Sequence, residues 1–404
     1  MRILFLSPRQ CWPARSGAKL REYHFARALA RRGPVTYLHF TDPGSEPLTR
    51  TDLPFCEQVV AIPKPAAYGA RQLIQGVLGP WPLPILNYAS EAMSAAVDRL
   101  TGAQSYDLIH LDSIHMIRYG QAAARRGKTS VRLVYNWHNI ESEAMRRFGD
   151  TVASGAKRWY ARLTASKLAA LERDILKTAF GHVVCSVREC SQLRGIAPAA
   201  RIEVIENGVD VASFSGIADA ASPAQKIVFV GLMDYSPNVE AAISFARRIW
   251  PVLRQRFPEL KLWIVGANPA PAVRQLGDLE GVTVTGTVPD VRPYYSGALA
   301  AIVPLRTGGG TRLKILEAMA AGVPVISTPL GAEGLDVTPG ENILLADPDD
   351  SETWLQHLEH LTASEAARKS LSASALDLVR GSYDWETLGG KLGDTYEGWL
   401  RNET

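Results

Sequence analysis

Three glycines followed by two cations and an acid form the segment of this sequence best suited to chemistry. It runs Gly308-Gly309-Gly310-Thr311-Arg312-Leu313-Lys314, with Glu317 one helical turn later. The glycines let the backbone approach a ligand closely, and Thr311 is a good N-cap for a helix over 312–321. A helix N-terminus binds anions, whereas cations in its first turn oppose the helix dipole unless an anion is bound there. The segment therefore predicts a diphosphate site, and the simpler alternative is a glycine-rich turn with a surface Lys314–Glu317 pair.

Glu317 follows Lys314 by three residues, so the two side chains share one face of the predicted helix. A carboxylate in that position can accept hydrogen bonds from ribose hydroxyls next to a bound diphosphate. We therefore expect Glu317 to contact the ribose.

Short apolar runs separated by helix-length stretches predict the elements that position this segment. Runs rich in Val, Ile and Leu are typical of parallel strands buried on both faces, so each half of the chain is predicted to be a doubly wound α/β domain. The predicted strands are 3–7, 35–40, 58–62, 108–111, 131–137, 182–186 and 202–205 in the first half, and 227–230, 261–265, 282–285, 300–304, 323–327 and 343–346 in the second.

A stretch without periodicity separates the two predicted domains. Residues 213–225 are rich in Ala, Ser, Gly and Asp, which is linker composition. We place the first domain at 1–212 and the second at 226–384. Residues 385–404 carry Leu388, Leu392 and Tyr396 at helical spacing, which predicts an amphipathic helix that packs back on the first domain.

Composition and charge limit the class of protein. The chain has 404 residues, 46% of them hydrophobic, and a net charge of +3, which is typical of a folded two-domain protein. No apolar run reaches the roughly 20 residues of a membrane span, and the four cysteines have no metal-ligand or disulfide spacing, so we expect a cytoplasmic protein. Residues 1–212 carry a net charge of +10 and residues 213–404 carry −7. The basic helix over 157–177 could lie on an anionic membrane or hold an acidic acceptor, and a solvated helix face is the alternative.

The segment over 306–326 resembles the donor-binding stretch of retaining glycosyltransferases of family 4. Further similar segments, in the family's order, are the loop 15–18, the stretch Ile205-Glu206-Asn207-Gly208-Val209-Asp210 and the turn Phe229-Val230-Gly231. The resemblance implies a GT-B fold, in which two doubly wound Rossmann-like domains face a central cleft. The N-terminal domain would bind the acceptor and the C-terminal domain would bind a nucleoside-diphosphate sugar.

Two departures from the family pattern affect the implied site. The family commonly has a second glutamate eight residues before Glu317, where this chain has Gly309, and it often has an Arg and a Lys after Gly231, where this chain has neither. We expect Arg312 and Lys314 to bind the diphosphate in place of those cations. The donor site would further include Gly231, Asn238 from the helix that starts at Ser236-Pro237, Val288, Gly309, Gly310 and Thr311.

The resemblance also implicates residues of the first domain. Gly17 lies in a loop before a helix predicted over 20–31, and such loops bring backbone N–H groups to the diphosphate. His138 ends a predicted strand where the family often has a histidine that contacts the transferred sugar. Asp112, Asn139 and Glu141 are candidate acceptor contacts, and the other histidines beside Asp112, His110 and His115, are weaker candidates.

The predicted function is transfer of a sugar, with retention of the anomeric configuration, from a nucleoside-diphosphate sugar to a hydroxyl of a glycan, a lipid-linked acceptor or a small molecule. Exopolysaccharide, cell-envelope glycan or glycolipid synthesis would use it. His138, Arg312 and Lys314 would be the catalytic residues, and we expect no cofactor or metal because Arg312, Lys314 and helix N-termini would neutralise the diphosphate. No nucleic-acid partner is expected. An epimerase of the same fold and a non-catalytic nucleotide-sugar-binding protein remain alternatives, and the base, sugar and acceptor stay open.

Overall fold

The computed structural model describes residues 1–14, 16–126, 131–217, 224–308 and 312–401. The chain divides into two compact units. Unit 1 comprises Met1–Glu206 and Gly389–Thr404, and unit 2 comprises Asn207–Leu388. Residues 207–212, predicted to end the first domain, lie in unit 2 because Val209 exchanges backbone hydrogen bonds with Tyr383 and Trp385, at N···O distances of 2.9 and 3.1 Å.

Unit 1 is built on a seven-stranded parallel sheet in the order β3-β2-β1-β4-β5-β6-β7. The chain reverses direction across the sheet between β1 and β4, which creates a topological switch point at the carboxyl ends of these strands. The strands are β1 (Ile3–Ser7), β2 (Val35–Thr41), β3 (Gln58–Pro63), β4 (Leu108–Asp112), β5 (Arg132–Asn136), β6 (Gly181–Val184) and β7 (Ile202–Val204).

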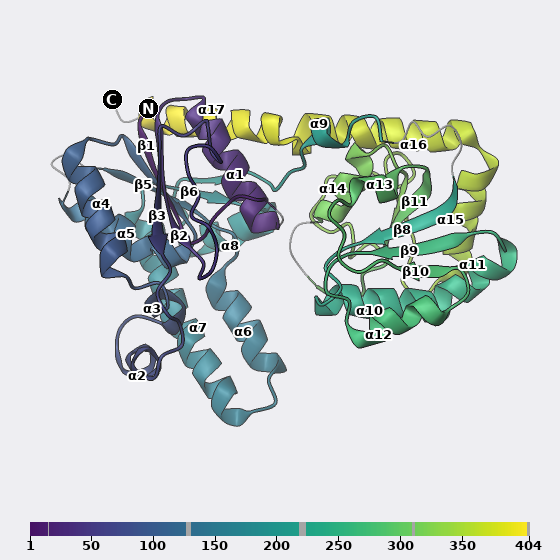
Figure 1. The fold of residues 1–404 in the computed structure, drawn as a ribbon, viewed down its shortest axis with the longest axis horizontal. Helices are drawn as coiled ribbons and strands as arrows, with labels where there is room; N and C mark the ends of the chain where they lie inside the picture. The colour runs from purple at the N-terminus through teal and green to yellow at the C-terminus, as the bar shows by residue number, and fades with distance from the viewer. Residues whose placement is uncertain (15, 127–130, 218–223, 309–311, 402–404) are drawn as a thin grey trace. The chain divides into compact units, whose positions relative to one another are not determined.

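Helices cover both faces of this sheet, with α4 and α5 on one face and α1 on the other (Figure 1). Every residue of β1 and β4 is buried, which explains why β1 is apolar over 3–6 and why β4 is apolar apart from His110 and its last residue, Asp112. The helices of the unit's main part are α1 (Gly17–Ala30), α4 (Glu91–Ala103), the 3₁₀ helix η1 (Ile114–Met116), α5 (Ile117–Arg126) and α8 (Val187–Ile196).

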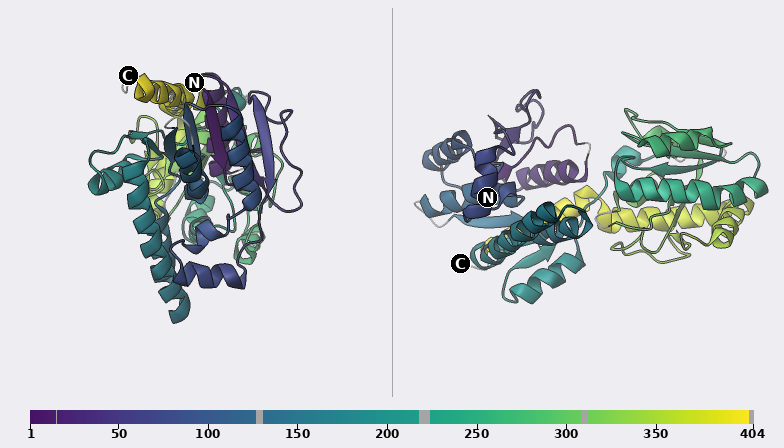
Figure 2. Two further views of the ribbon diagram at one scale, coloured as in Figure 1. Left: turned by 90° about the vertical axis from the view of Figure 1, so that its left-hand side faces the viewer. Right: turned by 90° about the horizontal axis from the view of Figure 1, so that it is seen from below.

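Two long helices of unit 1 form an antiparallel pair. Helix α6 (Glu141–Thr151) packs along α7 (Gly155–Thr178), and Figures 1 and 2 agree that the two lie side by side. Gly149 permits this approach, since a Cβ there would lie 3.1 Å from the Ala161 Cβ. Two short helices, α2 (Ala70–Leu78) and α3 (Leu83–Leu86), flank α7 (Figure 1).

The last helix, α17 (Trp385–Arg401), begins in unit 2 and continues into unit 1. Leu388, Leu392 and Tyr396 are buried along one side of it, as the helical spacing predicted. The Tyr396 hydroxyl is 2.7 Å from Nδ1 of His110 on β4. The helix therefore completes the buried layer over the sheet of unit 1.

Unit 2 is a second doubly wound domain, whose six parallel strands run in the order β10-β9-β8-β11-β12-β13. Helices α10 and α12 lie on one face of its sheet and α14 and α16 on the other (Figure 1). The strands are β8 (Ala224–Val230), β9 (Lys261–Val265), β10 (Val282–Val284), β11 (Ala298–Val303), β12 (Val325–Ser327) and β13 (Leu344–Leu345). The helices are α9 (Val211–Phe214), α10 (Ser236–Ser244), α11 (Trp250–Arg256), α12 (Pro271–Arg274), α13 (Arg292–Tyr295), α14 (Leu313–Ala320), α15 (Ser351–Ala363) and α16 (Glu365–Leu378), with π-helical turns η2 (Phe245–Ile249) and η4 (Val379–Tyr383) and a 3₁₀ turn η3 (Gln275–Asp278).

All thirteen predicted strands are confirmed, and only their ends shift. Two helix starts were wrong, those of α1 and α14. Helix α14 begins at Leu313 rather than at residue 312, and its N-cap is Arg312 rather than Thr311. Helix α1 begins at Gly17 rather than Leu20, because the Ser16 hydroxyl caps it by accepting from the Lys19 N–H. In α10 the N-cap is Tyr235, so Ser236 is the first helical residue and makes no cap.

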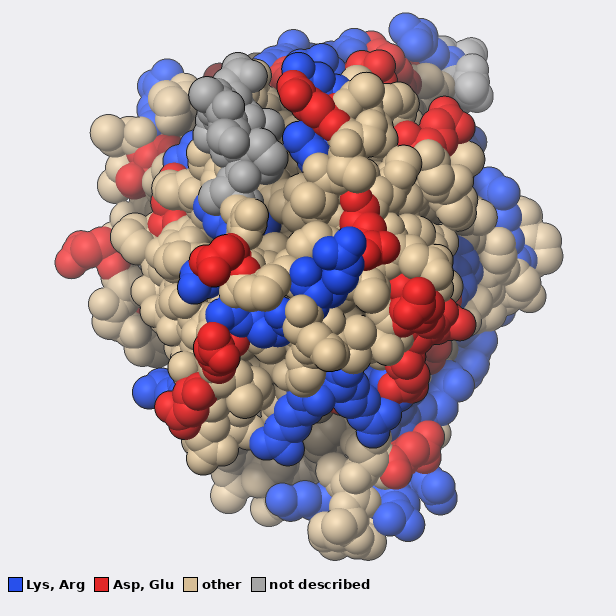
Figure 3. Space-filling model, turned by 90° about the vertical axis from the view of Figure 1, so that its right-hand side faces the viewer, with Lys and Arg blue, Asp and Glu red and all other residues tan. Residues whose placement is uncertain are grey.

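Charge is mixed on the face drawn in Figure 3, where acidic and basic side chains are interspersed. Among the described residues no helix is long and apolar enough to cross a membrane.

Candidate active site

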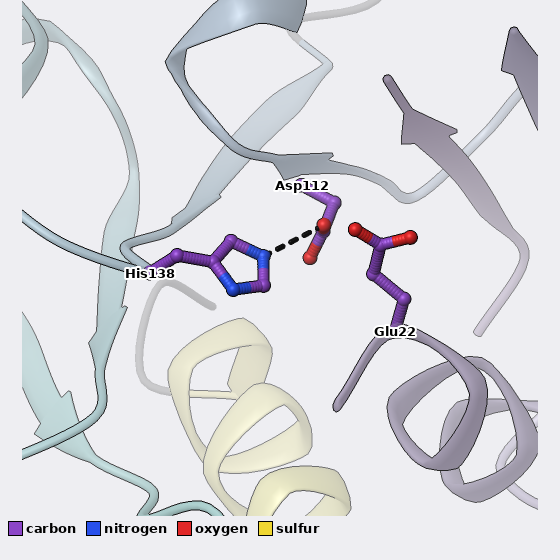
Figure 4. Close-up of side chains that lie close together, drawn as sticks. All are labelled: Glu22, Asp112 and His138. Carbon is purple, nitrogen blue, oxygen red and sulfur yellow. Dashed lines mark hydrogen bonds and ion pairs between the residues drawn. The ribbon is translucent and has the colours of Figure 1, made fainter. Parts of the chain in front are cut away.

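Three side chains from separate elements of unit 1 meet at the carboxyl edge of its sheet (Figure 4). Glu22 comes from α1, Asp112 ends β4, and His138 follows β5, and one ligand atom of each lies within 4.8 Å of the others. Nε2 of His138 is 2.8 Å from Oδ2 of Asp112. The structure thus joins two residues that the sequence had singled out, His138 and Asp112, to one that it had not.

The strand register explains why Asp112 is held so firmly. Asp112 is paired with Asn136 on β5, and the Asn136 amide donates to Oδ1 of Asp112 at 2.6 Å. The buried guanidinium of Arg21 donates in turn to Oδ1 of Asn136 at 2.9 and 3.0 Å. The Arg21 guanidinium also donates to the carbonyl of Ile205 at 2.7 Å. A continuous chain of hydrogen bonds therefore fixes the carboxylate that faces His138.

Glu22 and Asp112 have opposite protonation preferences. Burial and the neighbouring charge of Asp112 raise the pKa of Glu22 well above its usual range, despite Arg9 at 3.0 Å and a hydrogen bond from Ser7. Burial also acts to raise the pKa of Asp112, but His138 and hydrogen bonds from its neighbours outweigh this and hold it well below its usual range. Glu22 is therefore the protonated member of the pair, and Asp112 is the carboxylate that orients His138.

The same three side chains each offer one ligand atom that a cation could share. A metal ion would need the deprotonated form of Glu22 and would itself lower the pKa of that carboxyl. The Arg9 guanidinium lies 3.0 Å from Oε1 of Glu22 and already supplies positive charge there.

The two neighbouring histidines, His110 and His115, have structural roles. His115 accepts or donates through Nδ1 to the Ser113 hydroxyl at 2.7 Å, and burial, with Arg9 and His138 nearby, lowers its pKa to about 3. Burial also lowers the pKa of His110, which is bonded to Tyr396 below Asp112. Both rings are therefore neutral and packed rather than aimed at a ligand.

The other acceptor candidates follow His138 along the chain. Asn139 is exposed, and Glu141 begins α6. Burial and the nearby charge of Glu172 raise the pKa of Glu141, while Arg9 and Asn139 act in the opposite direction. Arg9 also pairs with Glu22, so its charge acts on Glu141 and on the cluster.

In unit 2, three of the predicted donor residues come together. Nζ of Lys314 is 2.5 Å from Oδ1 of Asn238, and the Asn238 amide donates to the carbonyl of Leu232 at 2.8 Å. A Cβ on Gly231 would lie 2.7 Å from Nδ2 of Asn238 and 3.1 Å from Nζ of Lys314. Glycine at position 231 is therefore required for the Lys314 ammonium to reach the end of β8.

Lys314 and Glu317 also interact, as their spacing predicted. Burial lowers the pKa of Lys314 to about 7, with Arg312 adding to the effect and Glu317 opposing it. Burial raises the pKa of Glu317 to about 7, with Lys314 opposing it. Both groups are thus poised near neutrality, and a bound anion would shift Lys314 toward its charged form.

Arg312 is only 5% exposed. Its Nη2 donates to the carbonyl of Leu330 at 2.7 Å and lies 3.6 Å from Glu333. Its Nε has no hydrogen-bond partner within the described part of the chain. One side of the guanidinium is therefore tied to the fold, whereas its buried Nε has no partner among the described residues.

For the other residues predicted to bind the sugar donor, the structure gives little further support. Gly309, Gly310 and Thr311 lie outside the described residues. Gly17 is the first residue of α1, and Val288 is half-buried against the core of unit 2. Their contacts with a donor stay predictions.

Sequence reasoning missed Glu22, Arg9, Asn136 and Arg21. One signal was present: Arg21 and Glu22 are charged, yet they share a helix face with Phe25 and Leu29, and all four are buried. Charged residues on the apolar face of a helix are expensive to bury unless they serve a polar network.

The two doubly wound units define a GT-B fold, and solved structures share it. Over all of both chains, the protein superposes on sucrose-phosphate synthase from Thermosynechococcus elongatus with a TM-score of 0.70 and 21% identity. It superposes on Anabaena HepE in complex with UDP with a TM-score of 0.65 and 17% identity, over 98% of this chain and all of HepE. Family models for "Glycosyltransferase Family 4" and "Glycosyl transferases group 1" match residues 16–213 and 224–364. The chain belongs to the family 4 glycosyltransferases.

Curated relatives match shorter parts of the chain at somewhat higher identity. The chain is 30% identical over 203 residues to phosphatidyl-myo-inositol mannosyltransferase of Mycolicibacterium smegmatis, covering 48% of this chain and 51% of that protein. It is 26% identical over 350 residues to D-inositol 3-phosphate glycosyltransferase of a Nocardioides species, covering 76% and 70%. It is 24% identical over 166 residues to a 44.6 kDa protein of the cps region of Klebsiella pneumoniae, covering 39% and 42%. The match spans about half the length of the first and third of these relatives.

Proposed function

We propose that the protein transfers a sugar from a nucleoside-diphosphate sugar to a hydroxyl acceptor, with retention at the anomeric carbon. The observation that carries this proposal is the meeting of Lys314, Asn238 and Gly231 at the start of α14. There a buried ammonium lies beside the first turn of a helix, and both favour a diphosphate. That helix lies within the matched family stretch.

To promote this transfer, the site must neutralise the negative charge of the departing diphosphate. Lys314 would supply a cation in a water-poor setting, where its charge is worth more than at the surface. The Nε of Arg312 would add a second donor. Glu317, half-buried one turn along α14, would accept from the ribose.

In unit 1, Asp112 would orient His138 toward the transferred sugar. A hydrogen-bonded carboxylate fixes the tautomer and direction of an imidazole, as it does in other enzymes. In the front-side route expected of the family, an oxygen of the leaving phosphate helps deprotonate the acceptor, so no carboxylate nucleophile is required.

For the acceptor we propose a glycan or glycolipid hydroxyl. Two relatives are named for inositol-containing acceptors, and one is placed in a cps region. Envelope glycan synthesis would suit these names and would bring the protein to a membrane surface.

A panel of UDP- and GDP-sugars tests the proposal. Binding is read as a thermal shift, and product formation is read with polyol, glycan and lipid-linked acceptors. Lys314→Met should weaken binding of the active donor about tenfold or more, consistent with loss of a charge-assisted contact. Lys226→Met, which removes a half-buried lysine of β8 in the same unit, is the matched control.

Three results would count against the proposal. Unchanged donor affinity in Lys314→Met would reject the site. Conversion of the donor sugar without a new glycoside would indicate an epimerase, and tight donor binding without turnover would indicate a binding protein.

A further inference from the structure

Helix α2 is amphipathic, but its apolar side faces outward. Ile74 is 59% exposed and Leu78 is 81% exposed, four residues apart on one face. Tyr68, just before the helix, is 71% exposed, and Leu73 is 40% exposed. The one residue that α2 buries is Gly76. A helix that served only to cover the core would bury its apolar side instead.

This orientation is fixed by contacts with α7 and α3. A Cβ on Gly76 would lie 3.0 Å from the Tyr160 hydroxyl and 3.3 Å from Cβ of Leu83, so the helix sits close against its support. Nζ of Lys167 donates to the carbonyls of Gly76, Val77 and Gly79 at 2.7, 2.8 and 2.6 Å. A lysine that caps the carboxyl end of a helix stabilises it through the helix dipole as well.

The surroundings of α2 are basic. No Asp or Glu occurs from residue 58 to residue 90. A pocket of about 670 Å³ adjoins the helix, and its lining includes Arg71, Gln72, Gln75, Trp81 and Arg118 but no carboxylate. The Arg118 guanidinium lies over the Trp81 ring at 5.3 Å. In the described ranges neither arginine forms an ion pair with an acid.

We propose that α2 docks on a bilayer that contains anionic phospholipids. A lipid phosphate enters the pocket between Arg71 and Arg118, and Tyr68, Ile74 and Leu78 insert at the level of the headgroups and upper acyl chains. An apolar face flanked by cations is the pattern of helices that lie in the membrane interface. The inference deepens the proposed function, on which it rests, by assigning the membrane contact to α2.

The positive charge around α2 favours an anionic bilayer over a protein partner. A contiguous apolar face alone would suit a protein partner or a second copy of the chain equally well. Unpaired arginines beside a pocket without acids favour a surface of fixed negative charge instead. In helix α7, where the sequence had suggested membrane contact, Lys167 supports α2.

Sedimentation of the full-length protein with vesicles tests this docking. Phosphatidylcholine vesicles with and without phosphatidylglycerol are used, and no sugar donor is present. Wild type should bind the anionic vesicles and not the neutral ones. Leu78→Glu should weaken binding at least about tenfold, because it removes an inserted side chain and adds a repelled charge. Arg71→Ala should weaken it about fivefold.

The control is Val187→Glu, which places the same change at a 68%-exposed apolar residue elsewhere in unit 1 and should bind like wild type. Donor binding and thermal unfolding of each variant show that the fold is intact. Loss of vesicle binding with donor binding retained supports the docking face, whereas absence of transfer activity would bear only on the proposed function.

Three outcomes would overturn the inference. One is no binding of wild type to anionic vesicles at low ionic strength. Another is equal binding by wild type and Leu78→Glu. The third is a concentration-dependent dimer in sedimentation analysis that Leu78→Glu dissociates, which would assign the face to a second copy of the chain.

Discussion

At the scale of single residues, the candidate site residues of each unit include buried groups whose charge is set by their neighbours. Lys314 and Glu317 both have a pKa of about 7, although the free side chains differ by several units. In unit 1 the pKa of Glu22 is raised and the pKa of Asp112 is lowered, so the negative charge of the pair lies on Asp112. Perturbed groups of this kind gather at functional sites, and they make the protein's behaviour depend on pH near neutrality.

Donor affinity should fall as pH rises through 7. Below that pH Lys314 is already protonated, while above it the free protein must take up a proton before a charged ammonium can meet the diphosphate. The affinity should weaken by up to about tenfold for each pH unit above 7, if the bound lysine is fully charged. Calorimetric titration with an intact nucleotide sugar between pH 6 and 9 measures this.

Lys314→Arg provides the comparison, because a guanidinium stays protonated throughout this range. Its affinity should vary little with pH. A pH profile equally steep in both proteins would show that some other group titrates on binding.

Glu22→Gln should change how stability depends on pH. The pKa of Glu22 is raised in the folded state, so the folded protein keeps a proton that the unfolded chain releases above its own pKa of about 4.5. The stability that this proton contributes is complete below that pH and is lost as pH rises toward the folded pKa. The glutamine mimics the protonated form and does not titrate.

The stability advantage of wild type over Glu22→Gln should therefore shrink from pH 5 to pH 8, by at most about 1.4 kcal/mol per pH unit. Urea denaturation at several pH values measures it, with the exposed Glu46→Gln as the control. A constant difference across this range would show that Glu22 is ionised in the folded protein.

At the scale of elements, regular patterns were predictable and long-range contacts were not. Buried strands such as β1 and β11 are almost entirely apolar, so the sequence predicted both sheets. The composition of the segment 308–317 predicted an anion site, and that site stays a prediction. The hydrogen bond from Tyr396 to His110 joins residues 286 positions apart and leaves no local pattern. The sequence also did not predict that the apolar side of α2 faces outward, because an amphipathic pattern does not tell which side of a helix is buried.

Neighbouring glycines of α17 should respond in opposite ways to alanine. A Cβ at Gly389 would lie 2.7 Å from Cβ of Ala28 on α1, whereas a Cβ at Gly390 would meet nothing within 4 Å. Gly390→Ala should stabilise unit 1 by about 0.5–1 kcal/mol through helix propensity. Gly389→Ala should destabilise it by about 1–3 kcal/mol through overpacking.

Chemical denaturation of the two variants measures both effects, and each serves as the control for the other. Equal stabilisation by both substitutions would mean that α17 does not pack on α1 in solution.

At the scale of the whole molecule, the two units carry separate parts of the proposed reaction. The cations suited to a diphosphate lie in unit 2, and the His138 cluster lies in unit 1. Ligand binding should therefore be detectable as local protection within unit 2.

A donor at 100 times its dissociation constant should stabilise the folded state by about 2.7 kcal/mol. Hydrogen exchange should slow at the first turns of α10 and α14, which carry Asn238 and Lys314. The Lys314→Met variant at the same donor concentration is the control. Exchange that is unchanged in these turns while the donor is bound would place the donor elsewhere.

The path of the chain has a consequence for how specificity can evolve. Unit 2 is one uninterrupted segment, Asn207–Leu388, and its two ends are paired where Val209 bonds to Tyr383 and Trp385. An insertion with adjoining ends can be exchanged through two nearby junctions, without redesign of the rest of the chain. Residues 207–388 could thus be exchanged as one genetic cassette. A chimera of this protein that carries the corresponding segment of a family member with a different donor should acquire that member's donor preference. Recombination could then vary the sugar while the acceptor half is inherited unchanged.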